Sequence, residues 1–398
     1  MDRLSGHHPA RSDGSQGSDD RSRVLHVGPL PPPVGGMATN VEAFLCSDVA
    51  RSFAIRNVRV DLIGKSRYRG FLRKLANLIN AAVLTAVVAS MVVVWRPVLV
   101  HVRTNSWGGF FEKAFLVLLA RLGRCRTILQ VHGGAFAEFY DQAGWLGKKA
   151  IRRVLAVPDR VIAISREMQG TLCRVSSRPD RVTVVENAVF VPQRTIWDVK
   201  EAAGSQRGQA PVKILFLNRV EPAKGIWELL EALGTVLERS NACARIVGPE
   251  PDCGGELMSR IGQLGLQDRI RLEPAVQGQA KEKAYLSADI YVLPSHVEGM
   301  PLGLLEAMSY GLPCIATPVG GVPSVIDHDR NGLLVPPKDP RALAAAILRL
   351  TQDASARRRL GSVARQTIVD RFSWDRRAKE FVSLYRDVLE TATSDRRR

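Results

Sequence analysis

The chain has 398 residues, 45% of them hydrophobic and 24% charged, the composition of a globular protein long enough for two domains. Its six cysteines are scattered and form no C-x-x-C pair, which argues against a zinc site or a disulfide framework and favours a reducing compartment. The formal net charge is +17, and residues 64–126 hold eleven Lys or Arg against one acid, Glu112. Such a field attracts polyanions.

Nucleic acid is the weaker interpretation of this charge. No recognition motif is visible, and the basic residues flank apolar runs rather than alternating with aromatic residues. An anionic membrane surface or a lipid-diphosphate acceptor fits better. Residues 1–22 are rich in Ser, Gly, Asp and Arg and carry no apolar core, so we expect a disordered tail and no secretory signal.

Residues 23–191 alternate short apolar strands with helical stretches, the pattern of a parallel sheet with crossover helices. The first strand, Val24–Val27, leads into a loop that ends in Gly35 and Gly36, with a helix from about Met37. A glycine pair at such a turn lets a ligand approach the backbone; alone it is as easily a tight turn, and the motifs further along favour the ligand. More strands are predicted at Val98–Val102, Thr127–Val131, Arg160–Ile164 and Arg181–Val185.

The run Leu75–Trp95 holds no charged residue and is about as long as a membrane span requires. It contains four polar residues and lies between two predicted strands, so a spanning helix would split the first domain across a bilayer. We prefer a helix that is buried or lies partly in the membrane interface. Basic residues precede the run and would meet anionic headgroups there: Lys65, Arg67, Arg69, Arg73 and Lys74.

The second half repeats the alternation after a break. Residues 192–211 are mostly polar, which predicts a linker. The strand Val212–Leu217 then opens a second domain that extends to residue 372. A last helix is predicted from the N-cap Ser373 to about Leu389, within residues 373–390, and residues 391–398 form a tail. Two doubly wound halves that face each other would form a cleft, with ligands at the carboxyl ends of the strands.

Glu298 and Glu306 stand eight positions apart at such a strand end, after the buried strand Ile290–Leu293. Glu298 lies in the loop, and Glu306 lies about one turn into the following helix. The unpaired amides and positive dipole end of a helix suit an anion such as a diphosphate, and an acid on either side suits the hydroxyls of a nucleotide sugar. The amides that open this helix are those of Leu302, Gly303 and Leu304.

Arg219 and Lys224 follow the first strand of the second half, where two fixed cations would stabilise the charge that a departing nucleoside diphosphate gains. Two solvated loop charges are the alternative, but the turn at Gly225 and the helix after it favour a clamp. For Glu306 the alternative is that it caps or pairs within its own helix. Glu298 has no basic neighbour in sequence, which leaves it freer for a ligand.

A metal ion could stabilise the same charge. The one Asp-x-Asp pair, Asp327 and Asp329, falls in a turn, where aspartates are favoured for backbone reasons. We therefore expect no metal and no other cofactor. His132 directly follows a predicted strand and precedes two glycines, so its position favours a functional role, whereas a structural role is the default for His26, His101 and His296.

In this order and spacing the motifs resemble those of the retaining glycosyltransferases of family 4, which have the GT-B fold. The resemblance extends from Val24 to about Leu389. Residues 298–306 resemble the E-x7-E motif and residues 218–225 the Arg…Lys-Gly diphosphate clamp. Residues 311–323 and 331–336 resemble the strand, glycine loop and next strand that follow the second glutamate.

The resemblance implies roles for single residues. Glu306 would bond the ribose hydroxyls, Glu298 would contact the transferred sugar, and His132 would reach the sugar and its leaving phosphate. The last helix would cross back onto the first domain. Ser324 and the segment Leu272–Ala275 depart from the family pattern, which leaves the base and the sugar open but not the reaction class.

We therefore interpret the chain as an α/β protein of the GT-B fold that transfers a sugar from a UDP- or GDP-linked donor with retention. The expected acceptor is a lipid-linked saccharide at the cytoplasmic face of the cell membrane, in polysaccharide assembly. The run Phe136–Phe139 and Tyr140, after His132, resemble exopolysaccharide-type members. The resemblance further implies that the leaving diphosphate helps to take the acceptor proton.

Two alternatives stay open. One is another enzyme of this fold, such as a nucleotide-sugar epimerase or a phosphorylase, although the lysine context of a phosphorylase cofactor is not found. The other is a membrane-associated binding subunit without activity. Loss of activity is disfavoured because the four charged site residues are intact: Arg219, Lys224, Glu298 and Glu306.

Overall fold

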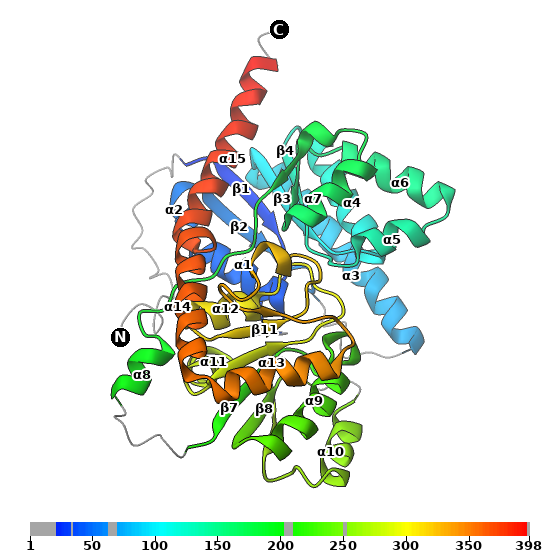
Figure 1. The fold of residues 1–398 in the computed structure, drawn as a ribbon. Helices are drawn as coiled ribbons and strands as arrows, with labels where there is room; N and C mark the ends of the chain where they lie inside the picture. Colours follow the sequence, from blue (N-terminus) through cyan, green and yellow to red (C-terminus); the bar gives the residue numbers. More distant parts are fainter. Residues whose placement is uncertain (1–20, 33–34, 63–69, 203–209, 250–252, 396–398) are drawn as a thin grey trace.

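The computed structural model describes residues 21–32, 35–62, 70–202, 210–249 and 253–395. Most of the predicted N-terminal tail, the basic residues Lys65, Arg67 and Arg69, part of the linker (203–209) and the last three residues of the C-terminal tail lie outside the described residues. The described chain contains two parallel sheets of six strands each, one in each half (Figure 1). The two doubly wound halves predicted from the sequence are therefore confirmed.

The first sheet has the strand order β2-β1-β3-β4-β5-β6. The edge strand β2 was not predicted, because only Val58 of its five residues is buried and its sequence gives no apolar run. The other strands lie where apolar runs predicted them. The bounds are β1 Arg23–Val27, β2 Ala54–Val58, β3 Leu99–Thr104, β4 Arg126–Val131, β5 Arg160–Ala163 and β6 Val182–Val184.

Helices cover both faces of this sheet. On one face α1 and α2 pack against the C-terminal helix, and on the other face α3 and α4 pack against each other, with α5, α6 and α7 beside them (Figure 1). Helix α3 continues without a break into a π-helical turn, Met91–Trp95. The bounds are α1 Gly36–Cys46, α2 Val49–Ser52, α3 Gly70–Ser90, α4 Gly108–Leu122, α5 Phe136–Gln142, α6 Trp145–Ala156 and α7 Arg166–Val175.

The second sheet has the order β12-β11-β10-β7-β8-β9, so β7 and β10 are neighbours although about seventy residues separate them. Its strands are β7 Val212–Leu217, β8 Ala242–Val247, β9 Ile270–Glu273, β10 Ile290–Leu293, β11 Cys314–Ala316 and β12 Leu333–Leu334. Its helices are α9 Ile226–Arg239, α10 Gly254–Gln263, α11 Gly278–Leu286, α12 Leu302–Ser309, α13 Pro340–Gln352 and α14 Ala354–Arg371.

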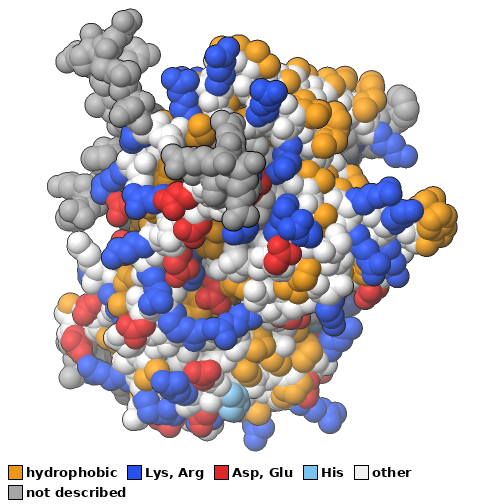
Figure 2. Space-filling model, turned by 90° about the horizontal axis from the view of Figure 1, so that it is seen from above, with side chains coloured by type: hydrophobic (Ala, Val, Ile, Leu, Met, Phe, Trp, Pro, Cys, Tyr) orange, Lys and Arg blue, Asp and Glu red, His pale blue; other side chains and the backbone are white. Residues whose placement is uncertain are grey.

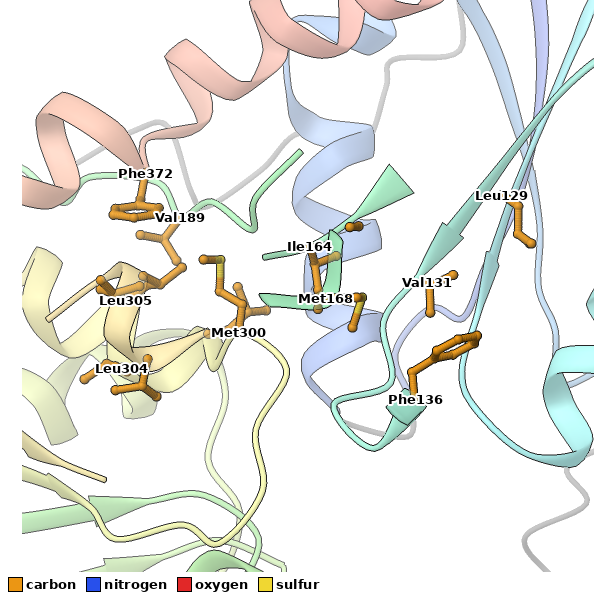
Figure 3. Close-up of a cluster of buried hydrophobic side chains, with 14 of the residues drawn as sticks. Leu129, Val131, Phe136, Ile164, Met168, Val189, Met300, Leu304, Leu305 and Phe372 are labelled. Carbon is orange, nitrogen blue, oxygen red and sulfur yellow. The ribbon is translucent and has the colours of Figure 1, made fainter. Parts of the chain in front are cut away.

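One buried apolar cluster joins the two halves (Figure 3). Met300, from the loop before α12, lies between the first sheet and α12, and every labelled side chain of the cluster is at most 8% exposed. The loops that carry the candidate site are thus fixed on a shared core. The labelled members are Leu129, Val131, Phe136, Ile164, Met168, Val189, Met300, Leu304, Leu305 and Phe372.

Two further elements connect the halves. The C-terminal helix α15, Trp374–Asp395, packs on the first sheet as predicted but extends beyond the expected end at Leu389. Its Tyr385 hydroxyl forms a 2.6 Å hydrogen bond with Nδ1 of His101. The predicted linker contains a helix that was not predicted, α8, Ile196–Ala202, which is held to the second half because the Trp197 indole donates to the Gly311 carbonyl at 3.1 Å.

Candidate functional site

The loops that follow β4 and β10 meet between the two halves. A Cβ atom added at Gly134, after β4, would lie 2.5 Å from the backbone carbonyl of Glu298, after β10. A Cβ added at Gly320 would lie 1.8 Å from the same oxygen, and Gly320 has a φ of +56°. Only glycine allows these approaches, so backbone from both halves fixes the position of Glu298.

The first glutamate of the motif is paired with the lysine of the predicted clamp. Nζ of Lys224 lies 2.8 Å from Oε1 of Glu298, which also accepts a 2.7 Å hydrogen bond from the Ser295 hydroxyl. Glu298 is 8% exposed and the Lys224 side chain 17%. Glu298 has no basic neighbour in sequence, but the inference that this leaves it freer for a ligand is wrong. β7 and β10 are adjacent in the sheet, so their loops meet and Lys224 reaches the carboxylate.

The second glutamate is bound by α11, the helix that precedes β10. Lys281 donates to Glu306 at 2.7 Å, and the Tyr285 hydroxyl donates at 2.8 Å. Glu306 therefore does not pair within its own helix. Burial, and then the Glu306 carboxylate, raise the pKa of Tyr285 well above its usual value, so the phenol stays protonated and donates. Sequence reasoning missed Lys281 and Tyr285. Their spacing of four puts both on one face of α11, but the sequence does not reveal that this face lies against α12.

The N-terminus of α12 lies at the ends of β7 and β10. Its N-cap residue, Pro301, supplies no side-chain cap, so the amides of Leu302, Gly303 and Leu304 have no helical acceptor. A Cβ added at Gly303 would lie 2.8 Å from the Tyr291 hydroxyl. Gly303 is thus needed to seat the helix, and the amides without a helical acceptor point to an anion site.

Lys224 and Arg219, the two predicted clamp residues, have different surroundings. Lys224 is held by Glu298 and donates to the Val297 carbonyl at 3.2 Å. Arg219 is 57% exposed and pairs with Glu221 at 2.9 Å. The structure therefore brings Lys224, but not Arg219, into contact with the glutamate motif.

His132 lies beside a buried arginine that sequence reasoning missed. Arg103, in β3, is 1% exposed and donates from Nε to Nε2 of His26 at 2.9 Å. Burial, and then Arg103 and His26, hold the pKa of His132 well below its usual range, so its imidazole is neutral at physiological pH. Its Nε2 is buried and has no hydrogen-bond partner among the described residues. Such a ring can form a hydrogen bond to a ligand, but it is not a ready proton donor.

A hydrogen-bond chain connects this arginine to the glutamate loop. Nη1 of Arg103 donates to Oδ1 of Asn40 in α1. Nδ2 of Asn40 donates to Asn187 at 3.3 Å, and Nδ2 of Asn187 donates to the Met300 carbonyl at 2.8 Å. The first half thereby orients the backbone two residues beyond Glu298.

Two further groups of residues were singled out in the sequence: the glycine pair at the start of α1 and the aspartates of the Asp-x-Asp turn. A Cβ at Gly35 or at Gly36 would meet no atom of the described chain within 4 Å, so the N-terminus of α1 is open, and no side chain caps it. Asp327 pairs with Arg330 at 3.1 Å. Asp329 pairs with Arg349 at 2.6 Å and also contacts Arg359. Among the described residues, no group of three or more His, Cys, Asp or Glu side chains could hold a metal ion.

His26 and His101 have the structural role expected of them. Both are fully buried, and His26 bonds Asn57 through Nδ1 at 2.6 Å. His296 also contacts a side chain of the protein, since its Nε2 lies 2.9 Å from a carboxylate oxygen of Glu228.

Comparison with known proteins identifies the class that this fold and site define. Residues 200–367 match the family described as glycosyl transferases group 1, and residues 11–188 match the glycosyl transferase 4-like domain. An uncharacterized glycosyltransferase of Methanocaldococcus jannaschii is 32% identical over 301 residues, which cover 73% of this chain and 75% of that protein. The chain belongs to the glycosyltransferases, with a group 1 domain in its second half and a glycosyl transferase 4-like domain in its first.

Solved structures confirm the GT-B fold. Sucrose-phosphate synthase from Thermosynechococcus elongatus matches with a TM-score of 0.76 at 19% identity, over 93% of this chain and 100% of that one. Anabaena HepE in complex with UDP-glucose matches with a TM-score of 0.69 at 17% identity, over 94% and 99%. The D-inositol 3-phosphate glycosyltransferase of Streptomyces bingchenggensis is 30% identical over 60% of this chain, and the match spans about half (54%) of that relative.

Proposed function

We propose that the chain transfers a sugar from a nucleoside-diphosphate donor, UDP- or GDP-linked, with retention at the anomeric carbon. One observation carries the proposal: the Lys224 ammonium and the uncapped amides of α12 lie at neighbouring strand ends, with Glu298 and Glu306 on either side of the amides. A diphosphate needs cations and N–H donors, and sugars need carboxylate acceptors. Anabaena HepE was solved in complex with UDP-glucose, which supports a uridine donor by analogy.

The chemistry proposed for this site is heterolysis of the bond between the sugar and the diphosphate. As that bond breaks, negative charge grows on the leaving phosphate, where Lys224, the α12 amides and Arg219 would stabilise it. The acceptor oxygen bonds to the anomeric carbon from the face that the diphosphate leaves. Its proton passes to a phosphate oxygen, so atoms and charge balance. A neutral His132 would orient the sugar or the phosphate by a hydrogen bond.

We propose that no metal is required. The cationic clamp supplies the charge that a metal would otherwise bring. The carboxylates of Asp327 and Asp329 are engaged by arginines, which makes them poor ligands.

We propose a lipid-linked saccharide as the acceptor, used in polysaccharide assembly at the cytoplasmic membrane face. Two features of the first half support it: its strong positive charge and its exposed apolar helices. A soluble acceptor, even a phosphorylated one, would not need the exposed apolar helices.

A thermal-shift screen of UDP-, GDP- and ADP-sugars tests the donor, with Lys224→Ala as the control that should lose the shift. Proton NMR of the product, taken before the anomers equilibrate, tests retention from the anomeric coupling constant. Inversion at the anomeric carbon would contradict the retaining mechanism. Binding without turnover on any acceptor would favour the inactive binding subunit.

A further inference from the structure

The outer face of α3 and α4 is apolar and exposed. Helix α3 with its π-helical extension is, by length and composition, able to cross a membrane, and 22% of its most apolar window is buried. Leu78 is 69% exposed and Leu122, at the end of α4, 79%. Together these side chains form what we term the α3–α4 face: Leu72, Leu75, Leu78, Ile79, Val83, Val93 and Val94 with Phe111, Phe115, Leu118 and Leu122.

This face is fixed to the first domain, so α3 does not span a bilayer in this fold. Asn80 is fully buried and donates from Nδ2 to the Val60 carbonyl at 2.9 Å, while its Oδ1 accepts from the Leu62 amide. Leu84 and Val88 are fully buried in the core. A Cβ at Gly123, after α4, would lie 2.2 Å from Val92 in the π-helical extension of α3. The end of α4 and this extension are therefore closely packed.

The α4 part of the face leads to the candidate site. Phe111, Phe115, Leu118 and Leu122 recur at spacings of four, three and four and so form one stripe along α4. At the N-terminal end of the stripe Trp107 is 45% exposed. Its neighbour Ser106 lies directly against the loop of His132, since a Cβ at Gly133 would lie 2.3 Å from the Ser106 hydroxyl. The apolar stripe therefore ends where the sugar would react.

The charge around the face selects its partner. Residues 70–122 contain one acid, Glu112, and it is paired with Lys113 at 2.8 Å. Exposed basic residues stand at its ends, Arg73 and Lys74 in α3 and Arg124 after α4. Figure 1 shows α3 to α6 on the right of the molecule, and on the same side of Figure 2 hydrophobic (orange) and basic (blue) side chains are interleaved while acidic (red) ones are few. A second copy of this chain, with a net charge of +17, would set these basic residues against their like.

We propose that the α3–α4 face docks on the surface of a bilayer that contains anionic lipids, with α3 and the α4 stripe lying in the interface. Docking in this orientation places the Trp107 end of the stripe, and the His132 loop beside it, at the membrane. The inference rests on the proposed lipid-linked acceptor, whose headgroup would then reach the site without leaving the bilayer.

The test is sedimentation of the full chain with phosphatidylcholine vesicles that contain or lack phosphatidylglycerol. We expect strong binding to the anionic vesicles, weak binding to the neutral ones, and partial release at high salt. The double variant Phe115→Glu/Leu118→Glu should bind about a hundredfold more weakly, because each apolar side chain contributes about tenfold. The control Met258→Glu/Leu264→Glu, at positions 57% and 53% exposed in and after α10 of the second half, should bind as the wild type does.

Nucleotide binding in calorimetry keeps this inference separate from the proposed function, since all three proteins should bind the donor nucleotide alike. Equal vesicle binding by the double variant and the wild type would overturn the docking face. The docking face would also be overturned if the wild type and the control were dimers in sedimentation velocity and the double variant were a monomer. A second copy of the chain would then be the partner of this face. Resistance of the bound protein to alkaline carbonate would overturn it in favour of a spanning helix.

Discussion

Nζ of Lys224 lies 2.8 Å from Oε1 of Glu298, so the cation of the proposed diphosphate clamp is paired with a carboxylate of the same site. Both side chains are largely buried, at 17% and 8% exposure. A diphosphate would have to share or replace this carboxylate as the partner of the lysine. The two residues are therefore expected to respond oppositely to substitution.

Lys224→Ala should weaken the binding of the nucleoside diphosphate by about 1.5–3 kcal/mol, the contribution of a charge-assisted hydrogen bond. Isothermal titration calorimetry with UDP and GDP measures the change. Lys213→Ala is the matched control, because Lys213 lies at the start of β7, whereas Lys224 lies in the turn that follows the other end of this strand, and it should have no effect. An unchanged affinity for UDP and GDP in a folded Lys224→Ala protein would show that Lys224 does not bind the diphosphate.

Glu298→Gln should leave nucleoside diphosphate binding unchanged or stronger, since it frees the lysine of its competing carboxylate, while sugar transfer falls about a hundredfold or more. Calorimetry and a product assay on one preparation separate the two effects. A variant that loses diphosphate binding and turnover together would mean that Glu298 serves to hold the loop rather than to contact the sugar.

Glu306 is expected to bond the ribose, although Lys281 and Tyr285 already donate to it. For the wild type, removing the 3′-hydroxyl of UDP should cost about 1.5–3 kcal/mol of binding. In Glu306→Gln the same change should cost only about 0.5–1.5 kcal/mol, because the acceptor is then neutral. Glu282→Gln, on the neighbouring helix, should keep the wild-type difference. If removal of the 3′-hydroxyl costs the same binding free energy in all three proteins, the ribose does not bind at Glu306.

Transfer should survive excess EDTA, because cations of the chain stand where a metal would act. The assay compares EDTA-treated enzyme with and without added Mg²⁺ or Mn²⁺. Activity that disappears and returns with the metal would contradict the proposal, and Asp327→Asn and Asp329→Asn would then be the next variants to assay.

The stability of the protein should fall below about pH 6.5. Burial lowers the pKa of His26 to about 3 and holds those of His101 and His132 well below their usual value, whereas all three titrate normally when unfolded. Below their unfolded pKa the unfolded chain binds three protons that the native state does not. The free energy of unfolding should therefore drop by about 4 kcal/mol per pH unit as the pH falls from about 5.5 toward 4.5, and by less between about 6.5 and 5.5.

Urea denaturation at several pH values measures this slope. His101→Gln should reduce it by about a third, whatever its effect on stability at neutral pH. A free energy that is flat with pH would show that the three rings are protonated in the folded state.

Much of the fold could be predicted from the sequence because its signals are local. Continuous apolar runs predict the buried strands of a parallel sheet, and most of these strands needed nothing beyond their own composition. The edge strand β2 and the helix α8 were not predicted because a half-exposed strand and a short polar helix lack such runs. The strands β8 and β9 were predicted only as part of the alternation that follows Val212–Leu217. Glu298, Lys224 and His132 were predicted as site residues because each follows a strand, where ligands of this architecture bind, and Glu306 because it lies in the helix that follows β10.

The partners of these residues were decided only by the tertiary structure. Lys224 meets Glu298, and Lys281 meets Glu306, across 74 and 25 positions of the chain. Arg103 reads in sequence as one more basic residue of the first half, yet it is buried beside His132. Strand order and helix placement bring these groups together, and both are set by how the apolar faces of the sheets and helices pack as a whole. A sequence records which residues can form such pairs, whereas the packing selects the pairs that form.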